Sequence, residues 1–145
     1  MAANSQKLLD RLKVTQYDLD PDATTATDVA WVDMRDYDKI LMSFFRTVGT
    51  SDLTYSMIGN AASDGSGTDV TIKTGSADPD AVGDYVFLEA DGADINQAGV
   101  DAGVADVRYV SLKAAFATAT DEGVVTYIRA GARHAQKDLT SDTVA

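Results

Sequence analysis

The chain has 145 residues, with 23 acidic and 12 basic side chains, a net charge of −11 and a pI near 4.2. This length predicts one domain with an ordinary hydrophobic core. The lack of cysteine excludes disulfides and thiolate chemistry, and one histidine excludes a multi-histidine metal site. Because phosphate backbones and anionic membranes repel an acidic chain, we expect no nucleic-acid or membrane partner. No apolar run approaches the ~20 residues of a membrane-spanning helix, and residues 1–14 lack a signal-peptide pattern.

The acidic residues are almost all of one kind, since only Glu89 and Glu122 are glutamates and the other 21 are aspartates. Aspartate competes with helix formation by bonding to nearby backbone groups, and it is common in turns. The composition therefore indicates strands joined by aspartate-rich turns.

The N-terminal part predicts a short helix followed by a connector. Ser5 is a suitable N-cap, and Leu8, Leu9 and Leu12 then fall on one helical face. Residues 15–28 are polar and contain a proline, so we expect a solvated connector there.

The rest of the chain shows alternating apolar and polar residues that predict about seven strands. The run 39–48 is apolar on both faces, as expected of a central strand. Turn residues at 49–52 and 119–123 each predict a hairpin between the flanking strands. Residues 90–105 predict a surface excursion with at most one helical turn. The expected strands are 29–34, 39–48, 53–58, 70–73, 85–89, 107–118 and 124–130.

This pattern predicts a mainly β fold, an antiparallel β-sandwich or barrel-like domain. Residues 1–28 would form an N-terminal arm or helix with its connector, residues 29–131 the domain, and residues 132–145 an extended C-terminal arm. Aromatic residues in the strands are expected in the core: Trp31, Tyr37, Phe44, Phe45, Phe87 and Tyr109.

Charge is distributed unevenly along the chain. Residues 74–107 contain eight acidic side chains and no basic one, which describes either a solvated face or a patch that docks on a basic partner. Basic side chains gather towards the two ends, which suits contacts with an acidic surface of a neighbouring molecule. The candidate partner-binding residues are Lys7, Arg11, Arg129, Arg133, His134 and Lys137.

Two patterns in the sequence bear on possible chemistry. The loop from Asp64 to Asp69 places oxygen ligands at alternate positions, as calcium loops do, but it lacks the downstream bidentate glutamate, so a flexible turn is favoured. His134 is the one imidazole available as a base, and no GxSxG motif surrounds any serine. We therefore expect no enzyme, no cofactor and no metal.

A resemblance adds a functional expectation. The stretch VDMRDYDKILMSFFRTVGTSDLTYSMIGNAASDG (residues 32–65) resembles a motif of small structural proteins of tailed phages and prophages. The segments YVFLEAD (85–91), VRYVSLKAAFAT (107–118) and VVTYIRAGARHA (124–135) follow in the same order. The resemblance covers roughly residues 29–135, and the 90–105 excursion is longer than the connection usual in that family.

The resemblance implies a virion structural protein without catalytic activity. The expected role is a capsid decoration (cement) protein, made in the host cytoplasm and bound to the outside of a shell of major capsid protein. Its partners would be that capsid protein and further copies of itself, as a homo-oligomer or as lattice neighbours. The alternatives are a head-completion, tail or fibre-associated structural protein, or a calcium- or sugar-binding β module that uses the 64–69 loop.

Overall fold

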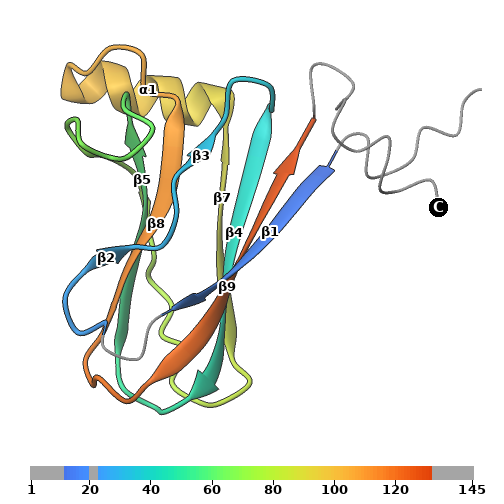
Figure 1. The fold of residues 1–145 in the computed structure, drawn as a ribbon, viewed down its shortest axis with the longest axis vertical. Helices are drawn as coiled ribbons and strands as arrows, with labels where there is room; N and C mark the ends of the chain where they lie inside the picture. The colour runs from blue at the N-terminus through green and yellow to red at the C-terminus, as the bar shows by residue number, and fades with distance from the viewer. Residues whose placement is uncertain (1–11, 20–22, 132–145) are drawn as a thin grey trace, which may run out of the picture.

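Two antiparallel β-sheets packed face to face form the domain in a computed structural model, which describes residues 12–19 and 23–131 (Figure 1). Sheet A has the strand order β1 (Leu12–Leu19), β9 (Glu122–Ala130), β4 (Lys39–Val48), β7 (Tyr85–Asp91). Sheet B has the order β2 (Thr27–Asp28), β8 (Tyr109–Phe116), β5 (Leu53–Asn60), β6 (Val70–Thr74), and the short β3 (Val32–Asp33) also pairs with β8. The predicted β-sandwich is therefore confirmed.

The core lies between the inner faces of the two sheets. Strand β4 has β9 on one side and β7 on the other, so the prediction of a central strand at 39–48 is confirmed. Its residues Ile40, Met42 and Phe44 are each 1 % exposed because their side chains point towards sheet B. Phe44 meets Phe116 of β8 edge to face, with ring centroids 5.7 Å apart, which ties the two sheets together.

Both predicted hairpins are wrong. Strands β4 and β5 belong to different sheets, as do β8 and β9, so the turns at 49–52 and 119–123 are crossovers between sheets. Alternation predicts that a segment is a strand, but it carries no information on which strand is its partner. Strands β5 and β6, which follow one another in the chain, do pair with each other.

The polar connector predicted at 15–28 is also wrong over its first part. Residues 12–19 form β1, which pairs with β9 along its whole length, from Leu12 opposite Ala130 to Leu19 opposite Gly123. Tyr17 packs edge to face on Tyr127, with ring centroids 5.1 Å apart. Val14, Thr15 and Tyr17 favour a strand, and pairing with β9 holds the whole segment in the sheet despite its polar residues. Leu12, expected on the face of the predicted N-terminal helix, is the first residue of β1, and the rest of that helix falls in residues 1–11, outside the described part of the chain.

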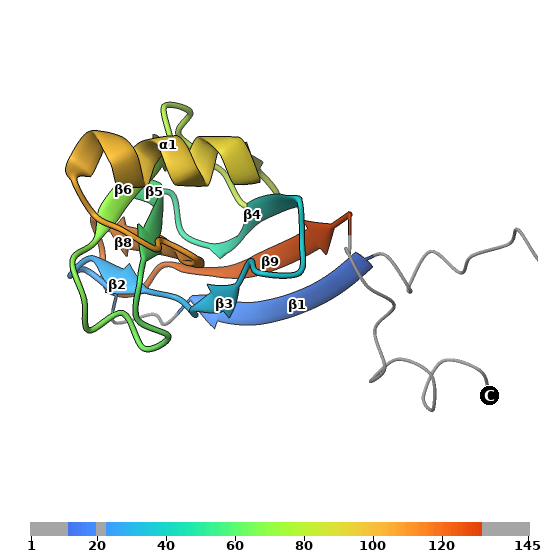
Figure 2. The ribbon, with the colours of Figure 1, turned by 90° about the horizontal axis from the view of Figure 1, so that it is seen from above.

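The 90–105 excursion contains a helix of 11 residues, α1 (Gly92–Ala102), which is longer than the single turn predicted. Asp91 and Asp94 form a reciprocal capping box at its start, and Gly103 ends it with a left-handed φ of 68°. Ile95 of α1 is buried, on the side of the helix that faces the domain. The helix covers one end of the sandwich, next to β6 and β7 and on the side opposite β1 in the view from above (Figure 2).

A buried ionic network closes the other end of the sandwich. The Arg46 guanidinium of β4 is 0 % exposed, binds the Asp121 carboxylate at 2.8 Å and donates to the carbonyl oxygens of Pro79 and Ser51. Asp121 also accepts the N–H and hydroxyl of Ser51, at 2.8 and 2.5 Å. Gly49 has φ +87° and lies so close to Asp121 that a side chain there would collide with the carboxylate. The network therefore joins the three connections that meet at this end.

Candidate interaction surface

Three aromatic side chains lie exposed on the outer face of sheet A. Phe45 of β4 is 46 % exposed, and Tyr85 and Phe87 of β7 are 68 % and 57 % exposed. The expectation that Phe45 and Phe87 belong to the core is therefore wrong, whereas Tyr37 and Phe44 are buried as predicted and Trp31 and Tyr109 are half-buried. Phe45 lies directly opposite Tyr85 in the β4–β7 register, so the aromatic residues form one cluster.

Further apolar side chains lie on this face of sheet A, on either side of the polar pair Ser43 and Thr126. Val124 of β9 lies opposite Phe45, Ile128 lies opposite Leu41, and Val14 of β1, 54 % exposed, lies opposite Ile128. In a two-layer sandwich the outer face of an antiparallel sheet is normally polar. The three aromatic residues alone expose roughly 300–400 Å², taking about 200 Å² for a whole aromatic side chain. A contiguous apolar patch of this size is often an interaction site.

Strand β7 forms a free edge of sheet A within the described chain. Arg46 N donates to Asp84 O and Gly92 N donates to Asp38 O, both at 2.9 Å. These two bonds show that residues 84 and 92 are in hydrogen-bonded positions of the β4–β7 ladder. Hydrogen-bonded and non-hydrogen-bonded pairs alternate in an antiparallel ladder, so the even-numbered residues of β7 bond to β4. The N–H and C=O groups of Tyr85, Phe87 and Glu89 consequently point outwards, away from the sheet.

A groove of about 290 Å³ runs beside this edge, where the two sheets of the sandwich separate. It is lined by consecutive residues of β7 from Tyr85 to Leu88, and by Tyr55, Thr74, Ser76 and Ala77 from the sheet B side. Four successive residues of β7 therefore border the groove, and of these Tyr85 and Phe87 have exposed side chains.

The acidic stretch 74–107 forms the surroundings of the β7 edge. It comprises the β6–β7 connection, β7 itself, α1 and the loop that follows α1. Asp84, Glu89 and Asp91 lie in or next to β7 and are exposed or partly exposed. A strand edge flanked in this way discourages pairing with another acidic strand and favours a segment that carries basic residues.

Of the predicted partner-binding residues, the structure describes Arg129 alone. Arg129 is 8 % exposed; its Nη1 donates to Asp33 O at 2.8 Å, and its guanidinium lies 4.8 Å from the centre of the Tyr37 ring. These internal contacts hold the Arg129 side chain within the domain, so it is not part of the proposed contact surface. The other candidates lie outside the described residues: Lys7, Arg11, Arg133, His134 and Lys137.

The segments that precede β1 and follow β9 leave the domain at one end of sheet A, because Leu12 lies opposite Ala130 in adjacent strands. Lys39 and Asp91 lie in the same row across the sheet. Leu12 and Ala130 therefore lie at the end of sheet A where Asp91 begins the connection into α1.

The 64–69 loop is held by protein contacts. Asn60 is 0 % exposed and binds Asp69 Oδ1 at 3.0 Å and Gly65 O at 3.2 Å, while Lys113 binds Asp69 Oδ2 at 3.0 Å. Asp64 accepts the backbone N–H of Ser66 at 3.0 Å, and hydrogen bonds from Ser66 lower the pKa of the Asp64 carboxyl. In residues 12–19 and 23–131 there is no group of three or more His, Cys, Asp or Glu side chains placed to hold a metal ion.

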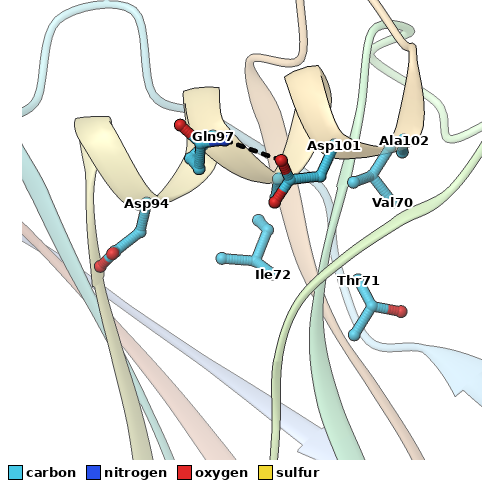
Figure 3. Close-up of a pocket in the computed structure, with 8 residues that line it drawn as sticks. Val70, Thr71, Ile72, Asp94, Gln97, Asp101 and Ala102 are labelled. Carbon is cyan, nitrogen blue, oxygen red and sulfur yellow. Dashed lines mark hydrogen bonds between the residues drawn. The ribbon is translucent and has the colours of Figure 1, made fainter.

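A second groove, of about 440 Å³, lies between α1 and β6 (Figure 3). Its two carboxylates already have partners, since Asp101 accepts from Gln97 Nε2 at 2.7 Å and Asp94 lies 3.5 Å from Lys73 Nζ besides closing the helix cap. We assign no ligand to this groove. Within the described chain, no helix has both the length and the apolar character needed to span a membrane.

Comparison with known proteins gives weak structural likenesses. No protein-family model and no curated protein sequence matches the chain. Similar solved structures include the SPBc2 prophage-derived protein YomS, 10 % identical, with a TM-score of 0.47 over 82 % of this chain and 95 % of that one. A Bacillus endospore appendage protein is 11 % identical (TM-score 0.43, 82 % and 86 % covered). A chain from infectious bursal disease virus strain Gx is 12 % identical (TM-score 0.42, 87 % and 31 % covered). Likenesses this distant support no assignment of function.

The exposed edge at β7 could not be predicted from the sequence, because both faces of the strand carry apolar side chains. Tyr85 and Phe87 alternate with Val86 and Leu88, which is the pattern of a strand buried on both faces. The acidic residues on both sides of the segment were the signal of a strand at the surface, since a strand inside a sheet is seldom flanked by so many charges.

Proposed function

We propose that the chain is a virion structural protein, a decoration protein that binds the outside of a capsid shell and stabilises it. The observation that carries the proposal is the apolar outer face of sheet A, where Phe45, Tyr85 and Phe87 are exposed. The resemblance of residues 29–135 to small structural proteins of tailed phages and prophages supports the same class.

In this role the apolar face would lie against the major capsid protein. Burial of roughly 300–400 Å² of aromatic surface, at about 25 cal/mol per Å², corresponds to about 8–10 kcal/mol before the cost of association. The acidic residues of the β6–β7 connection and of α1 would remain in solvent, and Glu89, on the same face as Phe87, would border the contact. Contacts repeated over a closed lattice would add through multivalency, so each one need not be strong.

The test uses particles and purified protein. Phe45→Ser should reduce the occupancy of the shell, measured by co-sedimentation and gel densitometry, because it removes the centre of the apolar cluster. Val14→Ser on the same face should reduce it by a smaller factor. Val100→Ser is the matched control, since Val100 is 64 % exposed on α1, away from sheet A. Full occupancy with Phe45→Ser contradicts the docking face.

Copy number separates the decoration role from its rivals. A decoration protein is present in numbers comparable with the capsid subunits, whereas a head-completion, tail or fibre-associated protein is present in far fewer copies. Densitometry of purified particles against the major capsid band gives this ratio directly. A low ratio would refute the decoration role.

A further inference from the structure

We propose that the free edge of β7 accepts the C-terminal segment of a second copy of the chain, residues 132–145, as an added antiparallel strand. This inference concerns the edge of sheet A, whereas the capsid proposal concerns its outer face. Tyr85 and Phe87 border both surfaces, but the test of this inference measures self-association of the chain and uses no capsid.

The acceptor is defined by backbone groups and shape. Tyr85, Phe87 and Glu89 present their N–H and C=O groups outwards. This orientation follows from the hydrogen bonds that join Arg46 to Asp84 and Gly92 to Asp38. A groove of about 290 Å³ lies directly beside them. An extended segment that enters this groove would satisfy the unpaired main-chain groups and place alternate side chains beside the β7 aromatics, which is the mode of peptide recognition by strand addition.

The donor has a suitable length and pattern. Fourteen residues follow Gly131, and seven are enough to match Tyr85–Asp91. In an extended segment Arg133, Ala135, Lys137 and Leu139 fall on one face because side chains alternate. The two acidic residues of the segment, at 138 and 142, fall on the other face.

Charge complementarity selects one register. In the antiparallel alignment that places Lys137 opposite Glu89, Leu139 lies opposite Phe87. This alignment joins a basic side chain to an acidic one and an aliphatic side chain to an exposed aromatic one. Directly opposed pairs of these kinds stabilise antiparallel strands. Residues 74–107 contain eight acidic side chains and no basic one, and the basic neighbour on β4 is Lys39, which lies opposite Asp91, whereas Glu89 lies opposite Leu41.

Geometry favours a second copy over the same chain. The added strand would lie three strand spacings from β9, about 14 Å. From Ala130 to Ala135 the chain spans at most about 17 Å when straight. The direct path across the end of the sheet is occupied by Asp38, whose N–H donates to Ala130 O at 3.0 Å and whose C=O accepts from Gly92 N at 2.9 Å. Only about 3 Å of chain is left for a path around this turn. A segment from a neighbouring copy has no such constraint, so we take the donor to be a second copy.

Two full-length variants test the exchange. Phe87→Pro blocks the edge: its N–H points away from β4, so the β4 ladder is kept, and proline is tolerated at edge positions of this kind. Leu139→Pro blocks the donor segment by removing a hydrogen-bond donor at its centre. We expect the wild-type chain to associate with rising concentration in sedimentation velocity, and each variant alone to remain monomeric. An equimolar mixture should form a heterodimer, because one variant keeps the segment and the other keeps the edge.

Other occupants give other results. If β7 paired with β7 of a second copy, Leu139→Pro would still self-associate. If the segment bound its own chain, the mixture would stay monomeric. Either result, or a wild-type chain that stays monomeric at every concentration, overturns the proposal.

Swapping the charges of Glu89 and Lys137 provides a second test, which does not require the proline variants to fold. Glu89→Lys and Lys137→Glu should each weaken self-association by roughly fivefold to tenfold, and the double variant should restore it. A synthetic peptide of residues 132–145 should bind the Leu139→Pro chain in the micromolar range by fluorescence anisotropy. No binding at about 1 mM, or no restoration in the double variant, would also refute the proposed contact.

Discussion

Replacing the buried Asp121 with alanine should destabilise the domain more than replacing any exposed aspartate. The carboxylate accepts three hydrogen bonds, from Arg46 Nη1, Ser51 N and Ser51 Oγ, and is itself 4 % exposed. Its loss leaves the Arg46 guanidinium, 0 % exposed, in the interior without a counter-charge. Removing one member of a buried ion pair costs about 3–5 kcal/mol.

Urea unfolding followed by circular dichroism measures this cost. With a slope of about 2 kcal/mol per M, the midpoint should fall by about 1.5–2.5 M. Asp80→Ala is the matched control, because Asp80 is exposed in the β6–β7 connection, and it should shift the midpoint by less than about 0.3 M.

The double variant Arg46→Met/Asp121→Ala decides whether an unpaired charge is the cause. It should recover a large part of the loss, since methionine keeps packing volume against Phe116 and leaves no buried cation. A midpoint shift below about 0.5 M for Asp121→Ala, or a double variant less stable than the single one, would show that the network contributes little and that this reasoning is wrong.

Three further outcomes are expected. Hydrogen bonds from the Ser51 hydroxyl and backbone, and from Arg46, hold the pKa of Asp121 below its ordinary value. The contribution of the Asp121 carboxylate to the stability of the domain is therefore complete above about pH 4 and is lost as the pH falls through the folded-state pKa. The urea midpoints of the wild-type chain and Asp121→Ala should converge at low pH. Tyr127→Phe should cost about 1–3 kcal/mol in urea unfolding, because the phenol oxygen accepts the Leu112 N–H at 2.8 Å and donates to Ala30 O at 3.0 Å; unchanged stability would argue against this bridge between the sheets. Asp91→Ala should cost about 1 kcal/mol and speed amide exchange in the first turn of α1, whereas equal exchange rates would show that the capping box is unimportant.

Strand existence could be predicted from the sequence, whereas strand pairing could not. The alternation of Ile40, Met42 and Phe44 reports local geometry, and the structure confirms it. The partner of each strand depends on contacts between distant segments, such as Arg46 with Asp121, which no local pattern encodes. Strand β1 was missed for the same reason, since its conformation depends on β9.

The candidate surface was only partly predictable. The acidic stretch and the basic ends were visible in the sequence, but the exposed aromatic residues were assigned to the core. Phe44 and Phe45 are identical neighbours on one strand, and one is 1 % exposed while the other is 46 % exposed. Hydropathy alone does not distinguish them, because the distinction requires knowing which face of sheet A has no second layer.

The pairing of Leu12 with Ala130 has a mechanical consequence. Force applied in opposite directions to the two flanking segments would open the β1–β9 ladder from this end, breaking its hydrogen bonds one after another rather than together. A ladder loaded in this direction resists poorly, because each bond bears the load in turn. An assembly that must withstand internal pressure would therefore need its load to pass through the sheet face, with the two segments anchored on the same side.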